Sequence, residues 1–429
     1  MEKQVFRNVE ETLYYEQLAN GLDVYLLPKV GFNKSFATFT TKYGSIDNEF
    51  IPLGQSEMTH VPDGIAHFLE HKLFEKEGYD VFEKFSQHSA SSNAFTSFTR
   101  TCYLFSCTSD LTENLTTLID FVQSPYFTEA TVEKEKGIIA QEIKMYDDNP
   151  DFKAYYGIIN NLFHNHPVKI DIAGTVDSIQ PITAELLYQC YETFYHPSNM
   201  LMFVVGDFDP EAVMTLIRDN QNQKDYQKED PIVRHYPDEP ETVVTSERTE
   251  YMEIKTPKVL VGIKETQQDL SGSRLLKYEL AIDIVYDLLF GSSSAYYEEM
   301  LEKGYINDSF TYETSFDVSF AFSLLGGDTK FPQELAESIK GRLSDIQALE
   351  IDEAAFERVK NKQVGRFLSA LNSMEFIANQ FTQYAFNEIE FFSILDELQA
   401  LTLSEVKELA AMHFKADKMS VYTLLPKAE

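Results

Sequence analysis

GIAHFLEHKLF, residues 64–74, is the stretch of sequence from which the rest of the chain is interpreted. It places His67, Glu70 and His71 in the order H-x-x-E-H. On a helix, positions i and i+4 lie on one face with position i+3 beside them, so these side chains project together. Two neutral imidazoles one turn apart can bind one zinc ion, each at roughly 2.0–2.1 Å. Glu70 would lie near the open position of that metal, where it can accept a proton from the metal-bound water and pass it to a leaving amine.

The motif is rare by chance. Nine histidines in 429 residues give an expectation of about 0.02 such triplets. The alternative interpretation is a pair of surface histidines on a solvated helix. Apolar side chains wrap most of this helix and argue against that alternative; they are Ile65, Phe68, Leu69, Leu73 and Phe74. A His-Glu-His face buried among them without a partner would cost several kcal/mol, so we favour a metal site.

A catalytic zinc site usually takes a third protein ligand. The helical pattern VEKEKGIIAQEIKMY, residues 132–146, offers Glu135 and Glu142, which are seven residues apart and share a face. One of them can bind the metal while the other orients a histidine. Either could also be an ordinary solvated charge. From the residues alone, the choice between the two glutamates stays open.

Composition and charge restrict the class of protein. No run of about 18 apolar residues is present, so no membrane-spanning segment is predicted. The first residues lack the apolar core of a signal peptide, and we therefore expect a cytoplasmic protein. Cys102, Cys107 and Cys190 form no CxxC pair and are expected to be buried as small hydrophobes.

The formal net charge is −33, from 69 acidic and 36 basic side chains. Such a field repels nucleic acid and anionic lipid surfaces, so neither nucleic acid nor a membrane is an expected partner. It would attract basic peptides, although a need for solubility also explains it.

Two related halves are predicted on either side of a polar, proline-containing connector. The segment at 182–205 aligns without a gap with the segment at 401–424, so that Thr183 meets Thr402. Each segment is expected to be a helix, a short polar turn and an apolar strand, which indicates a duplicated domain. We predict an N-terminal zinc-site domain at 1–220, a linker at 221–250 and a homologous C-terminal domain without the metal motif at 251–429.

Alternating strands and long helical patterns indicate an α+β fold. Residues 21–30 and 35–44 are predicted to pair as a β-hairpin. Helices are predicted at 63–76, 79–87, 110–123 and 130–146. Because strands are grouped with strands and helices with helices, we expect two similar domains, each an antiparallel sheet with helices packed on one face.

Three segments together resemble the pitrilysin/insulinase family of zinc peptidases. They are GIAHFLEHKLF at 64–74, SSNAFTSFTRTCYLF at 91–105 and EKEKGIIAQEI at 133–143. The resemblance implies that His67 and His71 are zinc ligands, with Glu70 as general base. It also implies that Glu142 is the third ligand and that Glu135 is an accessory acid, a choice that the residues alone leave open.

The resemblance further implies how substrate is held. Asn93 and Ala94 would lie on an edge strand that pairs with an extended peptide through backbone hydrogen bonds. Family members of this length consist of two similar α+β domains, as in the pitrilysin and mitochondrial processing peptidases. Two such chains, or one chain of double length, close around a chamber that admits peptides and excludes folded proteins.

The second half departs from the family pattern. Active members usually carry an Arg and a Tyr in this half that help to polarise the scissile carbonyl. The matching stretch here is AYYEEMLEKGYINDSF, residues 295–310, with Leu301 at the Arg position and Asn307 at the Tyr position. We therefore expect a dimer, in which a related but different chain supplies the missing Arg/Tyr pair. His413, the single histidine of the second domain, is expected to pack near a helix end.

The favoured interpretation is a zinc metalloendopeptidase that hydrolyses peptides or unstructured segments. The alternative is a non-catalytic binding or assembly subunit that retains a zinc site. The intact His67, Glu70, His71 and Glu142 argue against this alternative, and the missing Arg/Tyr pair argues for it. A purely structural zinc is less favoured, because such sites are usually closed by four protein ligands, often cysteines.

Overall fold

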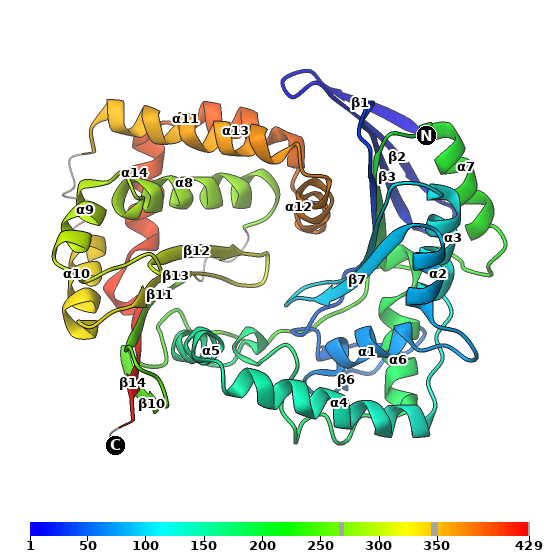
Figure 1. The fold of residues 1–429 in the computed structure, drawn as a ribbon, viewed down its shortest axis with the longest axis horizontal. Helices are drawn as coiled ribbons and strands as arrows, with labels where there is room; N and C mark the ends of the chain where they lie inside the picture. The colour runs from blue at the N-terminus through cyan, green and yellow to red at the C-terminus, as the bar shows by residue number, and fades with distance from the viewer. Residues whose placement is uncertain (266–269, 345–350, 428–429) are drawn as a thin grey trace. The chain divides into compact units, whose positions relative to one another are not determined.

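The computed structural model describes the chain except for residues 266–269, 345–350 and 428–429 (Figure 1). The chain forms two compact units, and each is a mixed α+β structure, as predicted. Unit 1 comprises Met1–Ile143, Ile170–His235 and Ala370–Phe386. Unit 2 comprises Lys144–Lys169, Tyr236–Ser369 and Asn387–Glu429.

Unit 1 is built on a seven-stranded sheet with the order β1-β2-β3-β9-β4-β8-β7. All neighbouring strands are antiparallel except β3 and β9, which are parallel. Every residue of β9 is buried, as expected for a central strand. The strands are β1 (Glu2–Phe6), β2 (Glu11–Gln17), β3 (Asp23–Pro28), β4 (Ser35–Thr41), β7 (Ala90–Thr96), β8 (Thr101–Cys107) and β9 (Met200–Gly206). A separate two-stranded sheet pairs β5 (Glu49–Phe50) with β6 (Thr59–His60).

The predicted hairpin between residues 21–30 and 35–44 is wrong. These residues form β3 and β4, but β9 lies between the two strands and pairs with both. The continuous apolar run of β9, MLMFVVG, requires a partner on each side and cover on both faces, so it takes the centre of the sheet. Strand β3 pairs on its other side with β2.

The helices of unit 1 include all four that the sequence predicts. These four are α1 (Ile65–Phe74), α2 (Val81–Gln87), α3 (Leu111–Val122) and α4 (Glu129–Asp147), of which α4 runs on into unit 2 after Ile143. The unit also contains α6 (Ala184–Phe194), the 3-10 turn η2 (Pro197–Asn199), α7 (Pro210–Gln221) and α12 (Met374–Phe386). Apolar side chains of the helices and of one sheet face form the core, for example Leu69, Phe39 and Met202.

Unit 2 is built on a five-stranded sheet with the order β10-β14-β11-β13-β12. Its strands are β10 (Glu247–Met252), β11 (Lys258–Glu265), β12 (Thr311–Phe316), β13 (Ala321–Asp328) and β14 (Met419–Pro426). Its helices are α5 (Pro150–Leu162), α8 (Gly272–Phe290), α9 (Ala295–Glu302), α10 (Pro332–Ser344), α11 (Glu353–Ala370), α13 (Ile394–Ala400) and α14 (Leu403–His413). The 3-10 turns η1 (Pro167–Lys169), η3 (Phe391–Ser393) and η4 (Ala416–Lys418) complete it.

The two sheets share one topology. The order β3-β9-β4-β8-β7 corresponds to β10-β14-β11-β13-β12, with the parallel pair in the same place. The aligned segments correspond as well, because α6 precedes β9 and α14 precedes β14. Thr183 and Thr402 both cap their helices through the side-chain oxygen. This agreement supports a duplication, while the boundaries at 220 and 250 stay a prediction.

Each half of the sequence contributes one helix to the unit that contains the other half's sheet. Helix α5, from the first half, packs on β11 and β14 in unit 2. Helix α12, from the second half, packs on β4 and β9 in unit 1, with Phe381 against the rings of Tyr25 and Phe203 at 4.8 and 4.6 Å. The face of each sheet that its own helices leave open is thereby covered.

The remaining sequence predictions concern single segments. Much of the connector at 221–250 is exposed, but Arg234 ties it to unit 1 through an ion pair with the buried Asp47, at 3.0 Å. Cys102, Cys107 and Cys190 are all buried and free, as expected. In the described part of the chain, no helix combines the length and the apolar character that crossing a membrane requires.

Candidate metal centre

Helix α1 is preceded by a glycine, at its N-cap, that no other residue could replace without strain. Gly64 has a φ of 88°, and a Cβ placed on it would lie 2.4 Å from the carbonyl oxygen of Ala173. The helix then buries Phe68, Leu69 and Leu73 against the core of unit 1. This packing fixes the rotation of α1 about its axis and therefore the direction of its polar side chains.

His67 and His71 lie together on α1, with ring centroids 4.6 Å apart. Glu142 on α4 completes the group: its carboxylate oxygens lie 3.9 Å from Nε2 of His67 and 3.6 Å from Nε2 of His71. One ligand atom from each of the three residues lies within 4.8 Å of the others. In a tetrahedral zinc site with bonds of about 2.1 Å, ligand atoms lie about 3.4 Å apart. The residues therefore fit a zinc ion after small side-chain movements.

Glu135 lies seven residues before Glu142 on α4 and contacts the other ring nitrogen of His71. Its Oε1 lies 3.1 Å from Nδ1 of His71, on the ring nitrogen that does not face Glu142. A carboxylate in this position orients a ligating imidazole and raises its basicity. The geometry thus separates two glutamates that the sequence alone leaves equivalent: Glu142 lies in the group that could hold an ion, and Glu135 supports one of its histidines.

Charge states in the centre suit a cation. Burial, with a smaller contribution from His71, lowers the pKa of His67 to about 3, so its imidazole is neutral at pH 7 and keeps a lone pair for a metal. Burial alone would lower the pKa of His71, but the hydrogen bond to Glu135 and the nearby carboxylates of Glu70 and Glu142 raise it overall. The donor set is therefore two imidazoles and a carboxylate in a strongly anionic surrounding.

Glu70 lies on the same helix and is 8% exposed. Its Oε2 accepts a hydrogen bond of 2.6 Å from Oγ1 of Thr96, the last residue of β7. Burial raises the pKa of Glu70, and Glu142 raises it further, against the opposing effects of Thr96 and His71. A carboxylate with a raised pKa is suited to accept a proton near neutral pH. Thr96 is a residue that the sequence reasoning missed, although it directly follows the Asn-Ala-Phe stretch.

Asn93 and Ala94 lie on β7, which is an edge strand of the sheet in unit 1. The side chain of Asn93 is exposed, and its Oδ1 accepts a hydrogen bond of 2.9 Å from the backbone N–H of Ala94. Strand β8 pairs with the other side of β7. An extended peptide could add to the open side of β7 in the manner of β-augmentation.

Leu301 and Asn307, the residues at the positions of the family's Arg and Tyr, lie in unit 2. Leu301 lies on α9 and is 50% exposed. The side chain of Asn307 donates to the carbonyl of Asp328 at 3.1 Å and accepts from the backbone of Ser309 at 2.8 Å. Neither side chain carries the charge or the hydroxyl that the family pattern would place there. His413 is fully buried at the last residue of α14, as expected.

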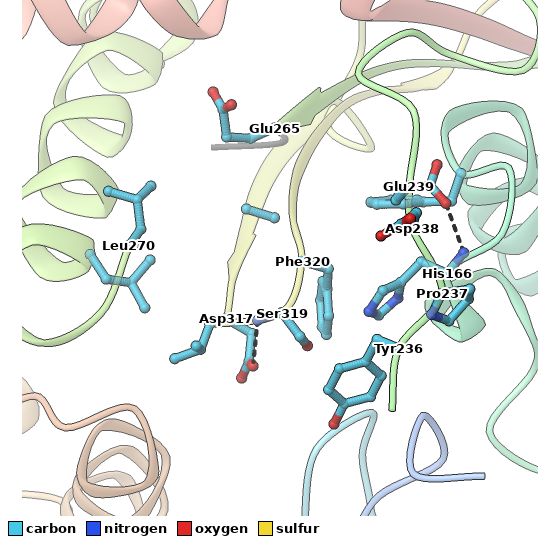
Figure 2. A pocket seen from close by; sticks show the side chains of 14 residues that line it. His166, Tyr236, Pro237, Asp238, Glu239, Glu265, Leu270, Asp317, Ser319 and Phe320 are labelled. Atoms are coloured by element: carbon cyan, nitrogen blue, oxygen red, sulfur yellow. Dashed lines mark hydrogen bonds between the residues drawn. The ribbon is translucent and has the colours of Figure 1, made fainter. Parts of the chain in front are cut away.

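A separate pocket of about 210 Å³ lies within unit 2. Figure 2 shows His166 beside Phe320 and Tyr236, with ring centroids 5.5 and 5.4 Å away. Two of its carboxylates are already paired, Glu239 with Lys264 and Glu265 with Lys418. None of the predicted site residues lines this pocket.

Family models match both halves of the chain. Residues 50–176 match the insulinase family (peptidase family M16), and residues 181–363 match the peptidase M16 inactive domain. The first match contains the H-x-x-E-H motif together with Glu135 and Glu142 of α4. The second agrees with a C-terminal half that carries no H-x-x-E-H motif.

Individual relatives extend the likeness over the whole chain. The uncharacterized zinc protease YmfH of Bacillus subtilis is 54% identical over 99% of both chains. The crystal structure of an M16-like peptidase from Alicyclobacillus acidocaldarius is 40% identical, with a TM-score of 0.94 over 97% of this chain and 99% of that one. Pitrilysin shares the fold at 15% identity, with a TM-score of 0.74 over 99% of this chain and 46% of its own length. The chain therefore belongs to the insulinase family, peptidase family M16.

Proposed function

We propose that the chain is a zinc endopeptidase that cleaves peptides or unstructured segments. The observation that carries this proposal is the convergence of His67, His71 and Glu142 within 4.8 Å, with Glu70 one residue before His71 on the same helix. The relatives named zinc proteases support the same class of reaction. A structural role for the metal would leave no use for a buried glutamate that belongs to none of the three ligands at this position.

The geometry supports one role for each of these residues. His67, His71 and Glu142 would hold the ion, and Glu135 would fix the ring of His71. A bound zinc ion supplies Lewis-acid polarisation of a substrate carbonyl and of water. Glu70 would take the proton from the attacking water at its carboxylate and deliver it to the leaving amine.

The edge strand β7 would hold the substrate. Backbone hydrogen bonds to β7 at Asn93 and Ala94 would align an extended peptide beside the base without selecting strongly for its side chains. An unstructured segment can adopt the extended conformation that this pairing requires, so unstructured segments are the substrate class that fits. A cytoplasmic location and a preference for basic peptides belong to the same proposal.

Replacing Glu70 by Gln tests the function. Glu70→Gln keeps the size of the side chain and the metal ligands but cannot accept a proton. We expect an unchanged zinc content and a fall in kcat of at least about 100-fold on unstructured peptides. Glu83→Gln, on the exposed side of α2, is the matched control and should leave both values unchanged. Peptide hydrolysis by Glu70→Gln at the wild-type rate would reject the proposal.

A second candidate function is a binding or assembly subunit that retains zinc, and the observation that favours it is Leu301 and Asn307 at the positions of the Arg/Tyr pair. We propose instead that a related chain supplies this pair in a heterodimer. The test is to assay the purified chain alone and then with a related half-length chain. Full turnover by the chain alone would reject the need for a partner. A zinc-loaded chain that stays inactive with every partner, and is indifferent to Glu70→Gln, would favour the subunit.

A further inference from the structure

We propose that Thr96 is a positioning residue for Glu70, and that it links the edge strand β7 to the orientation of the base. The inference rests on the proposed function, which it deepens by adding a residue that acts through Glu70. Thr96 itself need not contact substrate or metal. Its hydroxyl determines which oxygen of the Glu70 carboxylate is available.

The neighbouring hydrogen bonds determine which atom receives the hydrogen of the Thr96 hydroxyl. A threonine hydroxyl has one hydrogen to donate. Thr96 Oγ1 lies 2.6 Å from Oε2 of Glu70 and 3.3 Å from Oγ1 of Thr101. Thr101 donates its own hydrogen to the carbonyl of Tyr43 at 2.9 Å. The short contact and the charge of the carboxylate therefore direct the Thr96 hydrogen to Glu70.

The two oxygens of Glu70 are left in different states. Oε2 is bonded to Thr96, whereas no described residue donates a hydrogen bond to Oε1. A buried carboxylate without this bond would lose its one protein donor and could turn about its side-chain torsions. Thr96 thus holds Oε2 and leaves Oε1 for the water that attacks the substrate.

Thr96 also belongs to the strand that would bind substrate. It is the last residue of β7, two positions after Ala94, and it is paired in register with Thr101 on β8. Residues two apart on a strand point to the same side of the sheet. A peptide that adds to β7 would order the strand and, through Thr96, the carboxylate of Glu70. Extended substrates that reach Ala94 should therefore be cleaved faster than short ones that do not.

Valine and serine substitutions separate positioning from packing. Thr96→Val keeps the shape and removes the donor, and we expect kcat to fall about tenfold or more with KM and zinc content unchanged. Thr96→Ser restores a donor and should recover most of the wild-type kcat. Thr38→Val on β4 is the matched control: Thr38 is fully buried and, among the described residues, its hydroxyl has no hydrogen-bond partner. A Thr96→Val enzyme with wild-type kcat would overturn the inference.

A structural measurement decides the inference even if the chain alone is inactive. In crystal structures of the zinc-loaded protein, we expect the Glu70 carboxylate to be displaced or spread over rotamers in Thr96→Val and restored in Thr96→Ser. The side chains of His67, His71 and Glu142 should not move. An unmoved Glu70 in Thr96→Val would contradict the inference while leaving the proposed function intact. Peptide cleavage that survives Glu70→Gln would instead remove the proposed function.

Discussion

Glu135 would affect a bound metal ion through the ring of His71, because its carboxylate lies 3.1 Å from Nδ1 of that ring. Glu135→Gln keeps an acceptor but removes the charge that makes the imidazole more basic. We expect the zinc Kd to rise about tenfold, since changes to such supporting groups cost 10- to 100-fold, about 1.4–2.7 kcal/mol. Competition with a chromophoric chelator measures it.

Glu133→Gln provides the control for that prediction. Glu133 lies on the same helix α4, where its exposed carboxylate pairs with Lys136 rather than with a histidine. Its substitution should leave the zinc Kd unchanged. Equal losses in the two variants would mean that the net charge of the helix, and not the bond to His71, determines the affinity.

His166 in unit 2 makes stability depend on pH. It is 2% exposed, and burial lowers its pKa from 6.5 to about 4. Between these two values the unfolded chain binds more protons than the folded one, so stability is full above pH 6.5 and is lost as the pH falls toward 4. At pH 5 the expected loss is about 2 kcal/mol.

Urea unfolding of the zinc-loaded protein, followed by circular dichroism at pH 7 and pH 5, measures this loss. Zinc is included because it would keep His67 neutral in both conditions. His166→Asn provides the comparison, since its amide oxygen can accept the bond that Nδ1 of His166 accepts from the backbone of Val168. The variant should lose less stability between the two pH values, and an equal loss would contradict the assignment to His166.

At the residue scale, the sequence predicted that the side chains of one helical turn lie together, because that information is local. His67, Glu70 and His71 share one turn of helix, so their convergence follows from the helical repeat alone. The choice between Glu135 and Glu142 depends on where α4 lies relative to α1, which no helical period contains. Thr96 was missed for the same reason: nothing in its neighbourhood in the sequence shows that its hydroxyl reaches Glu70.

Among the elements, α5 is the one whose packing makes the sharpest prediction. A Cβ placed on Gly157 would lie 2.4 Å from the ring of Tyr422 on β14, and that ring is fully buried. Gly157→Ala should therefore lower the free energy of unfolding by about 1–3 kcal/mol. The unfolding midpoint of circular dichroism at 222 nm measures this change.

A glycine-to-alanine substitution on α4 should change the free energy of unfolding in the opposite direction. Nothing lies within 4 Å of a Cβ placed on Gly137 of α4. Gly137→Ala should raise the free energy of unfolding by about 0.4–1 kcal/mol, because alanine loses less backbone entropy in a helix. If both substitutions lowered the free energy of unfolding, the contact with Tyr422 would not explain why α5 requires a glycine.

At the element scale, the sequence predicted helices well and strand partners poorly. The helical pattern of α1 to α4 is complete within each segment. Strand β3 pairs with β9, and six helices separate the two strands in the sequence. Nothing in the sequence of β3 indicates which strand is its partner. The continuous apolar run MLMFVVG of β9 was the available signal for a central strand, since such a run is typical of strands covered on both faces.

At the scale of the whole molecule, the net charge of −33 predicts a dependence on salt. Cationic peptides should reach an anionic protein faster than anionic ones, and ions should weaken this difference. We expect kcat/KM for a lysine-rich peptide to exceed that for its glutamate-rich counterpart in dilute buffer. The ratio should shrink toward one as sodium chloride is raised to about 0.5 M. A ratio that does not change with salt would place the preference in local contacts instead.

The duplication could be predicted from two aligned segments, because each contains a helix cap and an apolar strand that the other repeats. The exchange of α5 and α12 could not. Both helices have ordinary amphipathic patterns, and such a pattern states that one face is buried without stating which sheet buries it.

That exchange has a consequence for synthesis. All seven strands of the first sheet have been translated by Gly206, but the helix that covers Tyr25 and Phe203 ends only at Phe386. A nascent chain on the ribosome therefore exposes an apolar sheet face until this helix has been translated. Chaperones bind such exposed apolar surfaces. For the same reason, a gene cut within codons 221–250 would yield two fragments that each lack one helix and must be co-expressed to restore both.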